Sequence, residues 1–166
     1  MNERMRTDVP QPTQMTLDEL VEEFEFLGDW DDQCDFLIDL GFELPKLPET
    51  AKTAENFVHG CQSNVWLVAE VKPNEPTDSG SESGAEPASN EDVSIEFIAN
   101  SDAVIVNGLI AVLMIVFNGR TPREILATDV QAVFTKLGLE RHLSPQRRNG
   151  LYGMVERIRQ IAAQAT

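Results

Sequence analysis

The 166-residue sequence has few cysteines and no long uninterrupted apolar run. Cys34 and Cys61 are its two cysteines, too few for the disulfide framework on which small secreted domains depend. The most apolar run, residues 103–117, contains a polar residue and a glycine, and it is shorter than the ~20 residues that cross a bilayer. Residues 1–14 are polar and lack the apolar core of a signal peptide. We therefore expect a soluble, cytoplasmic protein with free thiols.

Positive charge is also scarce. Lys and Arg together number 13 against 28 Asp and Glu, which gives a formal net charge of -15 and a pI near 4.4. Such a surface repels phosphate backbones and anionic lipid headgroups, so neither nucleic acid nor a membrane is expected as a partner. The acidic surface can serve solubility alone, or it can favour a partner with basic patches, since complementary charge speeds association. Composition leaves both interpretations open.

The spacings of common metal and phosphate sites are absent. With two Cys and two His, no CxxC and no HxxxH, the sequence lacks the ligand pattern of structural zinc sites, and no metal is expected. No glycine-rich phosphate loop is present either, because Gly60 and Gly108 stand alone, and Gly80 and Gly84 lie in the acidic low-complexity tract. No cofactor site can therefore be named.

What is present suits one packed domain. The hydrophobic content of 42% is enough for a core, and the length fits a single unit. We expect a flexible tail over residues 1–15 and one domain over residues 16–166. Within it, residues 73–92 are strongly acidic, contain no Lys or Arg and have no large apolar side chain. Because such a segment buries too little surface to offset its ordering entropy, we expect a disordered insertion there.

Sequence signals for helices lie near both ends of the expected domain. Thr16 followed by Glu19 forms a capping-box pattern, apolar residues then repeat at helical spacing, and Gly28 ends the predicted helix. A second helix is predicted over residues 29–41, with Cys34 on its inward stripe. Three further helices are predicted after Thr121, over residues 130–137 and after Pro145.

The middle of the chain favours strands. Residues 65–71 and 93–98 are short and rich in β-branched or alternating apolar residues, which predicts a pair of antiparallel strands. Residues 103–117 are ambiguous, since their β-branched content suits a strand and their length suits a largely buried helix; we prefer the helix. Helices flanking a small antiparallel sheet make an α+β fold.

The two cysteines lie in different settings. Cys61 lies in His59-Gly60-Cys61-Gln62-Ser63, where a glycine and small polar residues indicate a loop tip just before a strand. His59 could help to stabilise a thiolate there. The same pattern also fits an ordinary inward-facing small residue, so chemistry alone leaves Cys61 undecided. Cys34 is expected to be a buried structural thiol.

A cysteine hydrolase would need a base for its thiol and a group that orients the base. His59 and His142 are the two histidines, and nothing in their spacing marks either as half of a dyad with Cys61.

The segment Gly60-Cys61-Gln62-Ser63-Asn64-Val65-Trp66 resembles the GCQSxVW motif of the SufE family, sulfur acceptors that work beside cysteine desulfurases. The likeness extends over roughly residues 16–164. Its further blocks lie at residues 55–60, 101–112, 121–125 and 142–151. Two features depart from the family: the tract at residues 73–92 is longer than the usual connection, and Cys34 has no counterpart.

The resemblance implies a fold shared with IscU-type scaffold proteins, with a sheet of about three strands. It also implies that Cys61 accepts sulfane sulfur from the persulfide of a desulfurase of the SufS or CsdA type, stimulates that enzyme, and passes the sulfur to an iron–sulfur scaffold. Pyridoxal phosphate would belong to the desulfurase, so this chain would be a persulfide carrier without a cofactor and not a self-sufficient enzyme. The family works as a monomer or weak homodimer.

Residues around Cys61 gain roles from the resemblance alone. Asp102 and Arg147 match positions near the cysteine loop and are expected to position it or to contact the desulfurase; the alternatives are a structural ion pair or a helix cap. The supporting residues beside Cys61 are His59, Gly60, Gln62 and Ser63. We further expect the Cys61 thiol to be partly sheltered at rest. The rival interpretations are a free-standing thiol enzyme and an iron–sulfur or metal scaffold.

Overall fold

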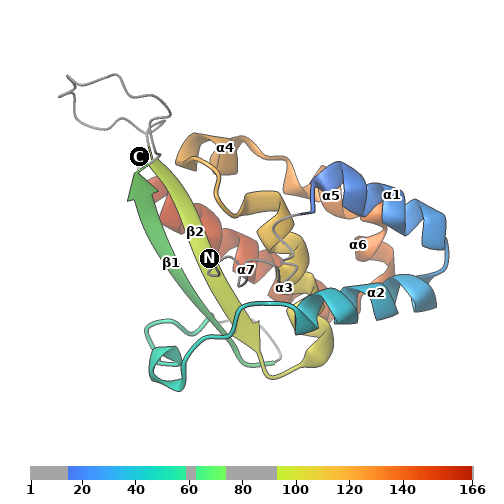
Figure 1. Cartoon of the computed structure of the whole chain (residues 1–166), viewed down its shortest axis with the longest axis horizontal. Coiled ribbons are helices and arrows are strands. Elements are labelled where there is room, and N and C mark those ends of the chain that lie inside the picture. The colour runs from blue at the N-terminus through green and yellow to red at the C-terminus, as the bar shows by residue number, and fades with distance from the viewer. Residues whose placement is uncertain (1–14, 59–62, 74–92, 166) are drawn as a thin grey trace, which may run out of the picture.

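The computed structural model describes residues 15–58, 63–73 and 93–165 (Figure 1). The tail predicted over residues 1–15 and the insertion predicted over residues 73–92 therefore lie almost wholly outside the described residues. Helices are α1 (Leu17–Leu27), α2 (Trp30–Phe42), α3 (Val104–Phe117), α4 (Pro122–Ala127), α5 (Val130–Leu137), α6 (Leu139–His142) and α7 (Pro145–Gln164). The strands are β1 (Val65–Pro73) and β2 (Val93–Ser101), and a single 3-10 turn covers Glu49–Ala51.

The predicted α+β class is confirmed, but the strand count is wrong. In the described part of the chain the sheet has two strands, β1 and β2, paired antiparallel in the register Val65↔Ser101 to Pro73↔Val93. Two flanking segments touch the sheet at one residue each, through the bridges Phe57↔Trp66 and Ile95↔Arg120. Because neither segment pairs over more than one bridge, neither becomes a third strand.

Helix α3 is the centre of the core. Residues 108–117 are all buried, which confirms the helix and explains why its sequence shows no amphipathic period: a helix covered on all sides needs no polar face. Figure 1 shows the β1–β2 hairpin along one side of the molecule, with the helices gathered on the other side. Val65, Leu67, Ile95 and Phe97 contribute buried side chains from the two strands.

The glycine that interrupts α3 is required by its contact with α2. A Cβ atom on Gly108 would lie 2.5 Å from the carbonyl oxygen of Leu37, and one on Gly41 would lie 2.7 Å from the Gly108 nitrogen. The two helices therefore cross backbone against backbone, which no larger residue at either glycine allows. This crossing fixes where α2 ends relative to the start of α3.

Both predicted caps of α1 are confirmed, and α4 and α5 have caps of the same kinds. Thr16 and Glu19 form a capping box on α1, and Thr121 and Glu124 form another on α4. Gly28 and Gly138 end α1 and α5 at φ values of 71° and 74°, in the left-handed region that favours glycine. The single turn α6, between α5 and α7, is not anticipated by the sequence pattern.

Within residues 15–58, 63–73 and 93–165, no helix combines the length and the apolarity of a membrane span.

Candidate functional site

Cys61, with His59, Gly60 and Gln62, lies outside the described residues, so the site is built from the chain on either side of it. The Val58 N–H donates to the Val65 carbonyl at 2.9 Å, and the Leu67 N–H donates to the Asn56 carbonyl at 2.8 Å. The chain that leaves the described region after Val58 thus returns beside it at Val65. Residues 59–64, called the cysteine segment below, connect two stretches of chain that are hydrogen-bonded to each other.

The stretch of chain that follows Cys61 is held by Asp102. Its carboxylate accepts hydrogen bonds from the Asn64 backbone N–H at 3.2 Å and from the Asn64 side-chain amide at 2.9 Å. The Asp102 N–H donates in return to the Asn64 carbonyl at 3.3 Å. Since β2 ends at Ser101 and α3 starts at Val104, Asp102 ties the exit of the cysteine segment to the junction of sheet and central helix.

Asn107, the polar residue inside the apolar α3, supports this junction. Its side-chain oxygen accepts from the Ser101 N–H at 2.8 Å, and its amide donates to the Ser101 carbonyl at 3.0 Å. The Ser101 hydroxyl accepts from the Ala103 N–H at 3.0 Å. The backbone on both sides of Asp102 is therefore fixed by side chains, which leaves Asp102 little freedom to move away from Asn64.

The side that precedes Cys61 is held from α7. The Arg157 guanidinium donates to the Glu55 carbonyl at 2.8 Å and to the Phe57 carbonyl at 3.2 Å. The Phe57 ring packs edge-on against Trp66, with centroids 6.0 Å apart. Arg157 is not predicted as a site residue from the sequence. The sequence shows only an arginine beside the buried positions of an amphipathic helix, and this pattern does not reveal which carbonyl groups the arginine binds.

Ser63 and Arg147 meet at a small hollow. Ser63 lies two residues after Cys61, and Arg147 belongs to the first turn of α7, whose N-cap Ser144 accepts from the Arg147 N–H at 3.2 Å. Both residues are half-buried. The remaining lining residues are Val106, Leu109, Gln146, Gly150, Leu151 and Met154. The hollow is thus mostly apolar, with one serine and one arginine at the cysteine segment.

Of the predicted site residues, the structure describes Ser63, Asp102 and Arg147. It brings all three to the cysteine segment: Asp102 bonds to Asn64, the neighbour of Ser63, and Arg147 shares a hollow with Ser63. Their roles in loop positioning or partner contact stay predictions, as do those of Cys61 and its immediate neighbours.

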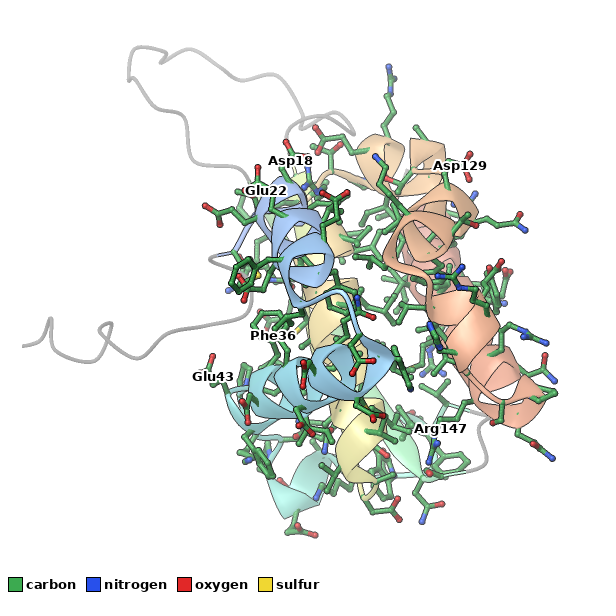
Figure 2. The ribbon with its side chains drawn as sticks, turned by 90° about the vertical axis from the view of Figure 1, so that its right-hand side faces the viewer. Asp18, Glu22, Phe36, Glu43, Asp129 and Arg147 are labelled. Atoms are coloured by element: carbon green, nitrogen blue, oxygen red, sulfur yellow. The ribbon has the colours of Figure 1, made fainter. Side chains whose placement is uncertain are left out.

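Cys34 is half-buried, so the prediction of a buried thiol is wrong in degree. Burial raises the pKa of the Cys34 thiol above its usual value, Asp35 raises it further, and the positive charge of Arg147 opposes this shift. Figure 2 shows Arg147 on the same side of the molecule as α2. At neutral pH Cys34 is held as the less reactive thiol form.

His142 takes part in a helix contact. Its ring stacks on Trp30 with centroids 4.6 Å apart and planes 3° from parallel, joining α2 to the end of α6. Across residues 15–58, 63–73 and 93–165, no three His, Cys, Asp or Glu side chains are placed to share a metal ion; His59 and Cys61 lie outside these ranges.

The α1–α2 hairpin has a strongly negative surface. Residues 16–45 contain eleven acidic residues and no Lys or Arg. Asp18, Glu22 and Glu43 are among those drawn in Figure 2. The ion pairs recorded for the described residues join Lys52 or Lys72 to glutamates elsewhere, and none of them reaches α1 or α2. The negative field of this hairpin is therefore not neutralised by salt bridges within the described structure.

Comparison with known proteins gives consistent matches. The family model "SufE: Fe-S metabolism associated domain" matches residues 18–162. An uncharacterised SufE-like protein of Rhizobium meliloti strain 1021 is 39% identical over 89% of this chain and 94% of its own length. An uncharacterised SufE-like protein of Rhizobium etli is 40% identical over 89% of both chains.

The fold itself has a solved counterpart. The solution structure of a hypothetical protein from Thermus thermophilus superposes with a TM-score of 0.61 over 90% of this chain and 94% of that chain, at 18% identity. This likeness concerns the fold alone. Together, the family model and the two relatives show that the chain belongs to the SufE family, whose domain is associated with iron–sulfur metabolism.

Proposed function

We propose that this chain carries sulfur for iron–sulfur cluster assembly, with Cys61 as the acceptor. Cys61 would take sulfane sulfur from the persulfide of a cysteine desulfurase of the SufS or CsdA type, stimulate that enzyme, and pass the sulfur to an iron–sulfur scaffold. The observation that supports this most is the frame around Cys61: Asp102 holds the chain after it and Arg157 holds the chain before it. Such a frame can present one residue to a partner while both of its flanks stay fixed.

The reaction is thiol exchange on a sulfur–sulfur bond. The Cys61 thiolate attacks the outer sulfur of the partner's persulfide, a new sulfur–sulfur bond forms on Cys61, and the original bond breaks. The electron pair of that bond leaves with the partner's cysteine as a thiolate, so no external oxidant or reductant takes part. A second exchange, with a thiol of the acceptor as the attacking group, returns Cys61 to its starting state.

In this proposal the chain turns over nothing by itself. Pyridoxal phosphate belongs to the desulfurase, and this chain needs no cofactor or metal of its own. The acceptor thiol must stay reduced between transfers, which suits the reducing cytoplasm. A monomer or a weak homodimer suffices, because the chemistry needs one Cys61 per encounter.

The negative charge of the α1–α2 hairpin supports docking of a partner with a basic surface. Its carboxylates have no Lys or Arg within residues 16–45 to pair with, so they favour a partner surface that is rich in basic side chains. The end of α2 is joined to the start of α3 at Gly41 and Gly108, close in the chain to Asp102. A desulfurase that docks on the cysteine segment would therefore lie near this negative surface.

Mass measurement after mixing the protein with a desulfurase, cysteine and pyridoxal phosphate tests the proposal. Wild type and Cys34→Ser are expected to gain one sulfur atom, and Cys61→Ser to gain none. The proposal is wrong if wild type gains no sulfur and Cys61→Ser leaves desulfurase turnover unchanged. Turnover of a thiol substrate in the absence of any desulfurase would favour a free-standing thiol enzyme instead.

A further inference from the structure

We infer that Arg157 is a positioning residue for the Cys61 thiol and acts through the backbone of residues 55–58. This inference rests on the proposed function, since it takes Cys61 as the acceptor. Arg157 is far from Cys61 in the chain, and none of the motifs that indicated the site includes it.

Arg157 ties residues 55–58 to α7, in addition to the bonds that tie them to β1. The Asn56 carbonyl and the Val58 N–H face β1 and are bonded to it. The Glu55 and Phe57 carbonyls lie two residues apart, and both accept from the Arg157 guanidinium. The guanidinium thus does for these two carbonyls what a neighbouring strand would do, and it joins them to α7.

The chemistry of the donor matters for this contact. A guanidinium is planar and carries five N–H groups in a fixed fork, so it can serve two carbonyl oxygens at once. A lysine ammonium at the same position could reach one of them as a point donor. Hydrogen bonds from a charged donor are shorter and stronger than neutral ones, which suits a contact that must hold backbone in place.

The consequence for Cys61 follows from its distance along the chain. Val58 precedes Cys61 by three residues, and Val65, which bonds to Val58, follows it by four. A shift of Val58 therefore moves the point from which the cysteine segment starts. Transfer between two sulfurs needs close, aligned approach, and a misplacement of ~1 Å can cost ~100-fold in rate. The Arg157 contact is where α7 limits such a shift.

The same helix provides a matched control. Arg159, two residues further on, donates to the Ile125 carbonyl at 3.4 Å and to the Leu126 carbonyl at 3.1 Å. It makes the same kind of double contact from the same element, but to the end of α4 and not to the lead-in of the cysteine segment. A purely structural role would make the two arginines equivalent.

The test uses the Cys34→Ser background, in which Cys61 is the sole thiol. Arg157→Gln, Arg157→Lys and Arg159→Gln are compared by unfolding midpoint, by the rate at which Cys61 reacts with a small disulfide reagent, and by single-turnover sulfur uptake at saturating desulfurase. Both Gln variants should lose similar stability. Arg157→Gln alone should slow uptake by about tenfold and quicken the reagent reaction, because the freed segment aligns poorly but admits a small molecule. Arg157→Lys should recover part of both rates.

Equal behaviour of Arg157→Gln and Arg159→Gln in the two rate measurements would overturn the inference, as would an Arg157→Lys variant no better than Arg157→Gln. The reagent measurement needs no desulfurase. If wild type takes up no sulfur at all, the proposed function fails, and the reagent rates still decide whether Arg157 controls the Cys61 thiol.

Discussion

Asp102 and Asn64 bind each other through three hydrogen bonds, two from Asn64 to the Asp102 carboxylate and one from the Asp102 backbone to Asn64. The two residues are 38 positions apart in the chain, so the contact is a long-range tie. It joins the exit of the cysteine segment to the start of the central helix. Removal of the Asp102 side chain should therefore disturb the position of the cysteine segment while the domain still folds.

Asp102→Ala is expected to slow sulfur uptake while the fold is kept. Asp102 is exposed, so loss of its two acceptor bonds should cost about 1–2 kcal/mol of unfolding free energy. Asp129→Ala is a suitable control, because the Asp129 carboxylate accepts from the Ala132 N–H at 3.2 Å, which caps its own helix α5 and is not a bond to Asn64. Urea unfolding should show similar losses for the two variants. Persulfide formation, followed by mass, should slow in Asp102→Ala alone; equal rates would remove Asp102 from the site.

Local signals make most of the fold predictable. Thr16 with Glu19, Gly28 and Thr121 mark helix ends by chemistry that acts within a few residues, and each mark is confirmed. Long-range pairing is a different matter. Phe57 looks like the start of a strand only if its neighbours continue the pairing, and the structure gives it a single bridge to Trp66. The expectation of about three strands came from the family resemblance and is wrong for the described residues, whereas the two strands predicted from the residues themselves are both present.

The supporting side chains of the site are only partly predictable. The family resemblance names Ser63, Asp102 and Arg147, and each lies at the cysteine segment. Asn107 and Arg157 are not predicted, because their partners are backbone groups of other elements. Asn107 bonds to Ser101 at the end of β2, and Arg157 bonds to Phe57, 100 positions away in the chain. Backbone acceptors carry no sequence signature, so such contacts become visible only in three dimensions.

The crossing of α2 and α3 gives a prediction for Gly108. In an ordinary helix Gly→Ala stabilises by about 0.5–1 kcal/mol, because alanine has the lower backbone entropy cost. At Gly108 the new methyl group would lie 2.5 Å from the Leu37 carbonyl oxygen and must push α2 away. We expect Gly108→Ala to lower the unfolding free energy by about 1–3 kcal/mol in urea titrations. A stabilised Gly108→Ala variant would show that the helices do not meet backbone to backbone.

The negative charge of α2 predicts salt-dependent association with the desulfurase. Raising ionic strength from about 0.1 M to about 1 M shortens the screening length from ~10 Å to ~3 Å, so the association rate constant should fall while the dissociation rate constant changes little. The triple variant Asp31→Asn, Asp32→Asn and Asp35→Asn should show a slower association and a weaker salt dependence than wild type in stopped-flow measurements.

A second triple variant controls for net charge in that experiment. Glu49→Gln, Glu70→Gln and Glu96→Gln remove the same number of charges from side chains that pair with Lys52 or Lys72. Association should slow less in this variant than in the α2 variant. If the two triple variants behave alike, the negative surface acts through total charge, and α2 has no special part in docking.

Tyr152, the single tyrosine of the chain, gives a prediction about pH. Burial, together with the hydrogen bond from its hydroxyl to the Glu140 carboxylate and the charge of that carboxylate, raises the pKa of Tyr152 to about 12. A tyrosine in an unfolded chain titrates near a pKa of about 10. The folded state therefore favours the neutral hydroxyl, and its stabilising contribution is complete below about pH 10 and is lost as the pH rises toward 12.

The ionisation of Tyr152 can be followed by the ultraviolet absorbance of tyrosinate, without interference from another tyrosine, because Tyr152 is the single tyrosine of the chain. Wild type should ionise near pH 12, and the same chain in denaturant near about pH 10. Glu140→Gln should lower the folded pKa only partway, since the carboxylate charge disappears while burial, the largest cause, remains. A folded-state midpoint equal to that of the denatured chain would contradict the contact between α6 and α7. A Glu140→Gln midpoint unchanged from wild type would mean that burial alone holds the proton on Tyr152.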